Sequence, residues 1–249
     1  MGTLDGQVVL IFGASSGIGR AAAVAFAEAG AAVALAARRG STLAELAGEL
    51  GTAGHTALAL PTDVGHRDQV DRAVAATVER FGRIDVLVNA AGLNTQHRRM
   101  SDLVQAEWDR ILATNLTGAF NTTHAVLPRM REQGGGLIVQ FSSVSGRWGD
   151  LSGAAYQASK HGIVGLCQAT MVEERLNGIR VTAILPGLVD TPMPMRRLEP
   201  PDRETMDKAL QPEDLAMACV FLATLPARTY IPELIMMPPR LQVVGQAMA

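Results

Sequence analysis

The chain has 249 residues, of which 48% are hydrophobic, and its formal net charge is −2. This length favours one domain over residues 1–249, and the near-neutral charge without a long basic run argues against nucleic acid as a partner. No apolar run reaches the ~18 residues that indicate a membrane span, and the N-terminal residues lack the features of a signal peptide. We therefore expect a cytoplasmic protein with no membrane partner. The histidines show no metal-ligand spacing, so no metal is expected, and Cys167 and Cys219 are predicted to be buried free thiols.

Short apolar runs alternate with helical patterns along the whole sequence. The predicted strands cover residues 7–12, 31–37, 56–60, 84–88, 137–141, 179–185 and 233–237. The predicted helices cover residues 20–29, 43–50, 67–81, a segment that begins near 102, 114–131, 154–176 and a segment that begins at 212. This alternation is typical of an α/β fold with a doubly wound, mostly parallel sheet, here of seven strands.

A glycine-rich turn separates the first predicted strand from the first predicted helix. Glycines at this place let the backbone turn tightly and approach a pyrophosphate, and the helix N-terminus offers free N–H groups and a positive dipole to that anion. A bare turn is the alternative, but the strand–turn–helix context favours a dinucleotide site. The residues predicted to contact the cofactor here are Gly13, Ser15, Ser16, Gly17, Ile18 and Gly19.

The end of the second predicted strand indicates which cofactor is bound. A carboxylate at this position would hold the ribose 2′-OH of NAD, whereas an arginine suits the 2′-phosphate of NADP. Ala37 ends the strand without a carboxylate, and Arg38 and Arg39 follow it. Because a guanidinium can grip phosphate through two hydrogen bonds, we expect NADP(H) rather than NAD(H). The alternative is a solvated arginine pair at a helix start.

Three residues late in the chain have the spacing of a proton-transfer site. Tyr156 and Lys160 are four residues apart in a predicted helix, so both side chains lie on one helical face. Ser143 lies thirteen residues before Tyr156, at the end of a predicted strand. A free tyrosine has a pKa of about 10, and a nearby ammonium group lowers that pKa, which suits a group that exchanges a proton with an oxygen.

With these residues the chain resembles the short-chain dehydrogenase/reductase family along nearly its whole length. The resemblance implies a Rossmann-like fold and an oxidoreductase that transfers a hydride between NADP(H) and a carbonyl or alcohol substrate. Tyr156 would exchange the proton, Ser143 would hold the reacting oxygen, and Lys160 would bind the ribose hydroxyls and lower the Tyr156 pKa. Asn115 would complete this catalytic set by holding a water that links Lys160 to solvent, although a buried structural asparagine is the alternative.

The same resemblance implies further cofactor contacts. Asp63 and Val64 would contact the adenine, although Asp63 could instead cap the helix that begins near Arg67. The other implied contacts, which lie near the nicotinamide half of the cofactor or share the catalytic site, are Asn89, Ala90, Ala91, Gly92, Tyr156, Lys160, Pro186, Gly187, Val189 and Thr191. The sequence departs from the family pattern at Phe12, at Ala90 and in the tail from Pro232, which lacks a glycine-rich segment.

The substrate is less well defined by the sequence. Residues 190–212, rich in Met, Pro and charge, are predicted to form a lid, the polar loop 93–101 either contacts substrate or is simply solvated, and Trp148 is either a pocket wall or an interface residue. One alternative enzyme is a dehydrogenase of small 3-hydroxy acids. In it, one of three arginines would grip the carboxylate: Arg98, Arg99 or Arg147. An alternative of another class is a non-catalytic NADP-binding regulator.

Two predicted helices indicate self-association. Residues 114–131 and 154–176 carry apolar or small residues on more than one face, and only one face of each helix can pack on the sheet. Members of the family that the chain resembles pair through these two helices about a two-fold axis. We therefore expect a homodimer or, more strongly, a homotetramer, with the atypical tail weakening the tetramer.

Overall fold

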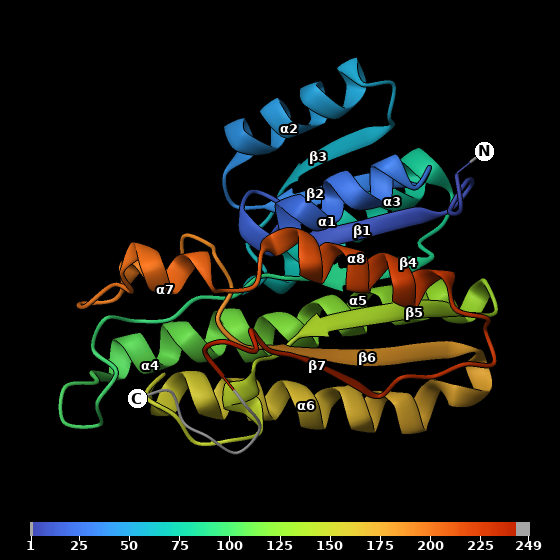
Figure 1. The fold of residues 1–249 in the computed structure, drawn as a ribbon. Coiled ribbons are helices and arrows are strands. Elements are labelled where there is room, and N and C mark those ends of the chain that lie inside the picture. Colours follow the sequence, from blue (N-terminus) through green and yellow to red (C-terminus); the bar gives the residue numbers. More distant parts are fainter. Residues whose placement is uncertain (1, 243–249) are drawn as a thin grey trace.

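Seven parallel strands form one sheet in the computed structural model, which describes residues 2–242 (Figure 1). The sheet order is β3-β2-β1-β4-β5-β6-β7, and every neighbouring pair is parallel. The strands are β1 Val8–Phe12, β2 Ala32–Ala37, β3 Ala57–Pro61, β4 Val86–Asn89, β5 Gly136–Phe141, β6 Ile179–Pro186 and β7 Glu233–Met236. This architecture confirms the predicted doubly wound α/β fold, and the order reverses direction between β1 and β4.

Helices cover both faces of the sheet because successive strand residues point to opposite sides. Val9 and Ile11 belong to one buried cluster with α1 Gly17–Glu28, α2 Gly40–Thr52 and α8 Pro212–Thr224. Leu10 and Phe12 belong to the opposite cluster with α3 Arg67–Phe81, α5 Gly118–Glu132 and α6 Ala154–Glu174. Figure 1 shows α1 and α8, which come from opposite ends of the chain, packed side by side on one face.

Shorter elements complete the chain. α4 Gln105–Leu112 and α5 are joined by a π-helical turn, Ala113–Thr117, and α7 Arg203–Asp207 lies in the segment before α8. Single 3-10 turns cover Val144–Gly146, Arg175–Asn177 and Pro194–Arg196. The helix expected from residue 102 begins at Gln105, because the backbone N–H groups of Asp102 and Leu103 bind the Arg99 carbonyl in a separate turn.

Pro61 marks a second small difference from the sequence analysis. The sequence predicts that it follows the third strand, but it is the last residue of β3 and pairs with Ala37 of β2. Proline is tolerated there because β3 is an edge strand, where one row of backbone N–H groups has no ladder partner. The extended strand leaves Asp63 just beyond the carboxyl edge of the sheet.

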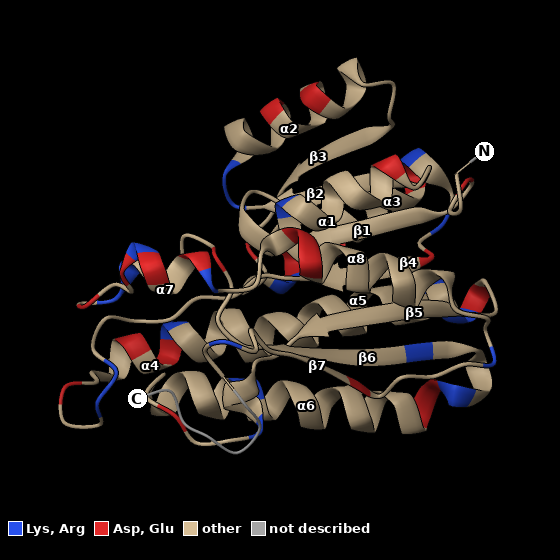
Figure 2. Cartoon of the chain, in the orientation of Figure 1, with Lys and Arg blue, Asp and Glu red and all other residues tan. Residues whose placement is uncertain are grey.

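The burial of the two cysteines agrees with the sequence analysis. Cys167 on α6 and Cys219 on α8 are both buried and free. Burial raises the pKa of each thiol to about 12, so both stay protonated at neutral pH. Figure 2 shows charged residues on helices and loops, with the strands almost free of them. None of the helices within residues 2–242 combines the length and the apolar character that crossing a bilayer requires.

Candidate active site

The turn between β1 and α1 is packed against the end of β4. Gly13 has a φ of 84°, and a Cβ atom placed on it would lie 2.7 Å from the Ala90 carbonyl carbon. A Cβ atom on Gly19, in the first turn of α1, would lie 2.7 Å from the Gly13 carbonyl carbon. Both positions therefore require glycine. They set the turn at the point where the strand order reverses, which is where open α/β sheets bind ligands.

A cleft opens beside this turn, and most of the predicted cofactor residues line it. Those present in its wall are Gly13, Ser15, Ser16, Gly17, Ile18, Arg38, Arg39, Asp63, Val64, Ala90, Ala91, Gly92 and Thr191. Gly19 and Asn89 are not part of this wall. Asn89 is buried, donates to Gln140 Oε1 at 2.8 Å and accepts from the Ala91 N–H at 3.2 Å, so it shapes the wall from behind.

The two arginines after β2 fit a phosphate group at one end of the cleft. Arg39 Nη2 donates to Ser15 Oγ and Ser16 Oγ, each at 2.9 Å, so guanidinium and hydroxyl donors are gathered beside the glycine turn. Arg38 is exposed in the same wall, and Ala37 places no carboxylate there. This donor set, rich in N–H and O–H groups, matches a 2′-phosphate better than a ribose hydroxyl.

Asp63 does not cap the helix that follows it. The N-cap residue of α3 is His66, and the Asp63 carboxylate instead accepts a hydrogen bond from the Gly65 N–H at 3.0 Å. The capping alternative is therefore wrong, because the Asp63 carboxylate binds a backbone N–H in the turn before α3 and not one in the first turn of the helix. Asp63 and the neighbouring Val64 both lie in the cleft wall, where they could contact a nucleobase.

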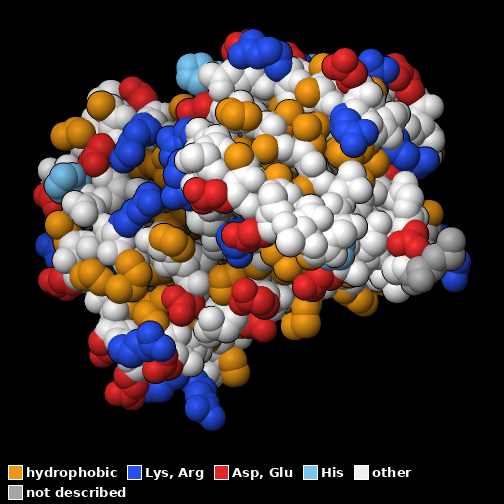
Figure 3. Space-filling view, turned by 90° about the horizontal axis from the view of Figure 1, so that it is seen from above, with side chains coloured by type: hydrophobic (Ala, Val, Ile, Leu, Met, Phe, Trp, Pro, Cys, Tyr) orange, Lys and Arg blue, Asp and Glu red, His pale blue; other side chains and the backbone are white. Residues whose placement is uncertain are grey.

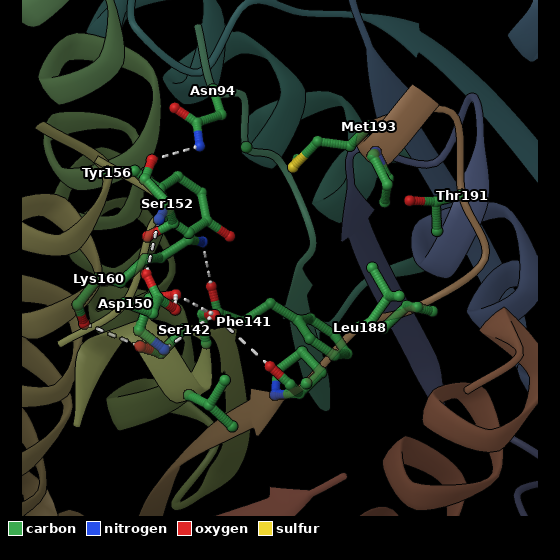
Figure 4. A pocket seen from close by; sticks show the side chains of 18 of the residues that line it. Asn94, Phe141, Ser142, Asp150, Ser152, Tyr156, Lys160, Leu188, Thr191 and Met193 are labelled. Atoms are coloured by element: carbon green, nitrogen blue, oxygen red, sulfur yellow. Dashed lines mark hydrogen bonds between the residues drawn. The ribbon is translucent and has the colours of Figure 1, made fainter. Parts of the chain in front are cut away.

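Ser143, Tyr156 and Lys160 line a second cavity that adjoins the cleft. Ser143 lies two residues beyond Phe141, the end of β5, and caps a 3-10 turn, where its Oγ accepts from the Ser145 N–H at 3.1 Å. Tyr156 and Lys160 lie on one face of α6, with Lys160 Nζ 5.4 Å from the centre of the tyrosine ring. In Figure 4, Tyr156, Asp150 and Ser152 face Met193, Thr191 and Leu188 across an open space.

Burial controls the proton affinity of this pair. Desolvation lowers the pKa of Lys160 to about 8, and its ammonium group donates to the Phe141 carbonyl at 2.7 Å. Desolvation raises the pKa of Tyr156, although a hydrogen bond from Ser143 opposes the rise. The predicted lowering of the Tyr156 pKa by Lys160 is therefore not seen. The loss of water around the phenol dominates, and the ammonium group is directed at a backbone carbonyl.

Asn115 lies in the π-helical turn and is completely buried. Its Oδ1 accepts from the Leu93 N–H at 2.9 Å, and its Nδ2 donates to the Leu93 carbonyl at 3.0 Å and to Ser159 Oγ at 3.1 Å. The side chain thus joins the segment after β4 to α6. It also lies near Lys160, since a Cβ atom on Gly92 would be 3.6 Å from Lys160 Nζ and 3.7 Å from Asn115 Oδ1.

The nicotinamide-side residues implied by the resemblance lie in the second cavity. Its wall includes Pro186, Gly187, Val189 and Thr191, together with Met193, Pro194 and Arg197 of the predicted lid. The lid segment is fixed at its far end, because Leu210 donates to the Leu188 carbonyl at 3.0 Å and pairs with Val189.

Some sequence-based candidates lie elsewhere. Trp148 is outside the walls of both cavities, and Arg147 forms an ion pair with Glu233 at 2.5 Å, which occupies its guanidinium group. Arg99 is exposed and also outside both walls, whereas Arg98 lines both.

Two charged residues of the second cavity were missed by the sequence analysis. Asp150 accepts from Ser145 Oγ at 2.5 Å and from the Ser152 N–H at 2.8 Å, and Arg197 faces the same cavity. The only sequence signal that included Arg197 was the prediction that residues 190–212 form a lid. In Figure 3, Lys and Arg side chains gather around a hollow in the surface where hydrophobic side chains are visible.

Comparison with known proteins agrees with this geometry. The sequence profile described as short chain dehydrogenase matches residues 7–202. The chain is 36% identical over 234 residues to the 3-oxoacyl-[acyl-carrier-protein] reductase of Synechocystis, covering 93% of this chain and 94% of that protein. It is 41% identical over 207 residues to levodione reductase of Leifsonia aquatica, covering 82% and 78%.

Solved structures show the same fold. A crystal structure of levodione reductase superposes with a TM-score of 0.87 at 34% identity, covering 93% of this chain and 96% of that one. A metagenomic short-chain oxidoreductase in complex with NADP gives a TM-score of 0.82 at 32% identity, covering 95% and 98%. The chain therefore belongs to the short-chain dehydrogenase/reductase family and is an oxidoreductase of that family.

Proposed function

We propose that the protein transfers a hydride between NADP(H) and a carbonyl or alcohol substrate, with Tyr156 as the general acid and base. The observation that carries this proposal is the junction of the two cavities. The cleft beside the glycine turn and the cavity with Ser143, Tyr156 and Lys160 share the wall residues Ile18, Ala90, Gly92, Asn94, Arg98, Thr191 and Met193. A ligand that runs from Arg38 to Tyr156 therefore fits one continuous site.

The donor set around the cleft supports NADP(H) as the cofactor. Arg38 and Arg39 with the hydroxyl groups of Ser15 and Ser16 would hold the 2′-phosphate, and the glycine turn would hold the pyrophosphate. When bound, the cofactor supplies or accepts the hydride, and the protein supplies placement and charge. The solved relative in complex with NADP is consistent with this choice.

The raised pKa of Tyr156 favours reduction at neutral pH. Burial keeps the phenol protonated, so it can give its proton to the carbonyl oxygen of a substrate. Ser143 would donate a hydrogen bond to the same oxygen. Lys160, mostly charged at pH 7 with a pKa of about 8, would bind the ribose hydroxyls. Asn115 holds the backbone of Leu93 beside this group, and the water link to solvent stays a prediction.

Both named relatives are reductases, which also supports the reductive direction. The non-catalytic regulator is disfavoured because a binding protein has no use for Ser143, Tyr156 and Lys160 in one cavity. Among the arginines considered for a small 3-hydroxy acid, only Arg98 remains in the cavity. We also propose a cytoplasmic location and, from the resemblance, a homodimer or homotetramer.

The test is Tyr156→Phe, which keeps the ring and removes the proton. It should lower kcat for reduction at least about 100-fold, because a positioned general acid contributes roughly 10²–10⁴-fold. Binding of NADPH, followed by its fluorescence, should be unchanged. Tyr230→Phe is the matched control, since Tyr230 is the other tyrosine and lies outside both cavity walls. A Tyr156→Phe enzyme with most of its kcat would exclude the proposed role.

A further inference from the structure

Two arginines from separate segments face the cavity that contains Tyr156. Arg98 lies in the segment after β4, and Arg197 lies in the segment after β6, just beyond the turn Pro194–Arg196. The carboxyl ends of these strands meet at the same edge of the sheet. The two guanidinium groups are half-buried, so their charge is not spread into open solvent.

Arg98 is fixed against the start of the helix that carries Tyr156. Gly153 has a φ of 95°, and a Cβ atom placed on it would lie 2.7 Å from the Arg98 carbonyl oxygen, so the close approach depends on glycine. Asn94 Nδ2 donates to the Ser152 carbonyl at 2.9 Å and fastens the same loop. Arg98 Nε donates to the Thr95 carbonyl at 3.1 Å, which sets the direction of the guanidinium group.

Arg197 carries an unsatisfied donor inside the protein. Its Nε is buried and has no hydrogen-bond partner within the described residues. Across residues 2–242, neither Arg197 nor Arg98 takes part in an ion pair. A buried unpaired donor is costly and rare in native proteins, and a bound ligand that accepts hydrogen bonds removes that cost.

The net charge of the cavity wall favours an anionic ligand. Besides the two arginines and Lys160, the wall contains a single carboxylate, that of Asp150, and this group is already bound by Ser145 and Ser152. Two guanidinium charges against one carboxylate leave one net positive charge, without counting Lys160. Both arginines act electrostatically on Tyr156, where their charges oppose the rise of its pKa, so they lie near the reacting group.

We infer that Arg98 and Arg197 form a carboxylate-binding subsite, so that the substrate is an oxoacid in reduction and a hydroxy acid in oxidation. A guanidinium group binds a carboxylate through two parallel hydrogen bonds, which fixes the orientation of the substrate as well as its charge. This inference rests on the proposed function and names the substrate class of the same site. It assigns to Arg197 a role in specificity, while Arg147 and Arg99 have none.

The experiment compares acids with their neutral esters. Pyruvate, acetoacetate and levulinate place the carboxylate at three distances from the ketone, and each has a methyl ester of nearly the same shape. With wild-type enzyme and NADPH, at least one acid should exceed its ester in kcat/KM by about tenfold or more. Arg98→Gln and Arg197→Gln should each lower kcat/KM for that acid about 10–100-fold, mainly through KM, as expected for a lost charge-assisted pair.

Several controls separate carboxylate binding from a structural role of the two arginines. Arg99→Gln, one residue away and outside the cavity, should leave acid and ester kinetics unchanged. The ester should stay within about twofold in the Arg98→Gln and Arg197→Gln variants, while Arg98→Lys and Arg197→Lys should keep part of the acid activity that the Gln variants lose. Thermal stabilisation of the NADP⁺ complex by the preferred acid should disappear in the double variant, which gives a readout independent of turnover.

The outcomes are distinguishable. An equal loss for acid and ester would show that the arginines act structurally, and an increased KM for NADPH alone would show that they bind the cofactor; either result overturns the inference. Wild-type enzyme that prefers every ester would overturn it as well. If acid preference is absent while Tyr156→Phe still abolishes turnover, the inference fails and the proposed function stands. If Tyr156→Phe keeps its activity, the proposed function itself fails.

Discussion

The two halves of the chain differ in the hydrophobic side chains that they leave in water. Within the described residues, every exposed large hydrophobic side chain comes after residue 99. Five lie in or beside segments that border the substrate cavity, namely Met100, Val104, Leu151, Met195 and Leu198. Six lie on the outer faces of helices or beyond them and on β7, namely Phe120, Val172, Leu176, Met217, Phe221 and Ile235. All of this exposed large apolar surface within the described residues therefore belongs to the later part of the chain, where a ligand could cover it.

The two halves also build their binding walls differently. The cofactor half relies on backbone proximity, since Gly13 and Gly19 bring β1, α1 and β4 together. The substrate half relies on side chains from loops, with Arg98 and Arg197 held by segments that are not adjacent in sequence. Backbone walls tolerate few substitutions, whereas loop side chains can be exchanged without altering the sheet.

The largest effect is expected where a side chain is added to the backbone-built wall. Gly19→Ala would place its Cβ atom against the Gly13 carbonyl group, so the turn must move. We expect roughly 1–3 kcal/mol of destabilisation from the overpacked contact and about a 100-fold weaker affinity for NADPH, measured by denaturant unfolding and by fluorescence titration. Gly48→Ala is the control, because that exposed glycine in α2 has no atom within 4 Å of a new Cβ. Equal behaviour of the two variants would contradict the backbone-built wall.

A smaller effect is expected at the rim of the same cleft, where side chains replace backbone. Arg38→Asp combined with Arg39→Leu removes the phosphate donors and adds a carboxylate suited to ribose hydroxyls. The ratio of kcat/KM for NADPH over NADH should fall by at least about tenfold, since a charge-assisted bond contributes about 1.5–3 kcal/mol. Arg72→Leu, on the outer face of α3, serves as the control. A wild-type enzyme that prefers NADH would refute the assignment.

A third effect is expected at Lys160, which is buried in the wall of the substrate cavity. Its pKa of about 8 lies below the value of about 10.4 in the unfolded chain, so at intermediate pH the unfolded state binds the extra proton. The free energy of unfolding should therefore rise with pH between about 8 and 10, by at most about 1.4 kcal/mol per pH unit relative to Lys160→Met. Urea unfolding of both proteins at several pH values measures this difference. Parallel pH curves would show that Lys160 is not desolvated.

The smallest effect is expected on the mass of the protein in solution, which reports how many chains assemble. If the exposed side chains of α5 and α6 pair two subunits, light scattering at micromolar concentration should give two or four times the 26.3 kDa of one chain. Phe120→Asp, on the outer face of α5, should shift the mass toward one chain, whereas Ala44→Asp on α2 in the cofactor half should not. A wild-type mass of one chain would rule out the predicted assembly, and a stable dimer would leave only the helix contact.

Features set by short stretches of sequence could be predicted. Strand and helix order follows from local apolar periodicity, and the glycine turn follows from the need for close backbone approach at Gly13. The spacing of Tyr156 and Lys160 likewise placed both side chains in one cavity, because the two residues share a helix face. These features depend on neighbours within a few turns of the chain.

Features that depend on burial or on distant segments could not be predicted. The direction of the Tyr156 pKa shift depends on how completely the folded protein removes water from the phenol, which no spacing reveals. Arg197 and Asp150 reach the cavity through loops that share no pattern with Tyr156. The π-helical turn around Asn115 was anticipated only as helix, since residue types do not distinguish the two hydrogen-bond ladders.

The contact between α1 and α8 has a consequence for synthesis of the protein. Phe26 and Ala23 of α1 share a buried cluster with Leu215, Cys219 and Leu222 of α8, although α1 ends at Glu28 and α8 at Thr224. At a translation rate of about 5–20 residues per second, α1 waits roughly 10–40 s on the ribosome for the helix that covers it. During this interval its apolar side chains are open to chaperones and to neighbouring nascent chains. The N-terminal nucleotide-binding half is therefore synthesised first, but its core is sealed last.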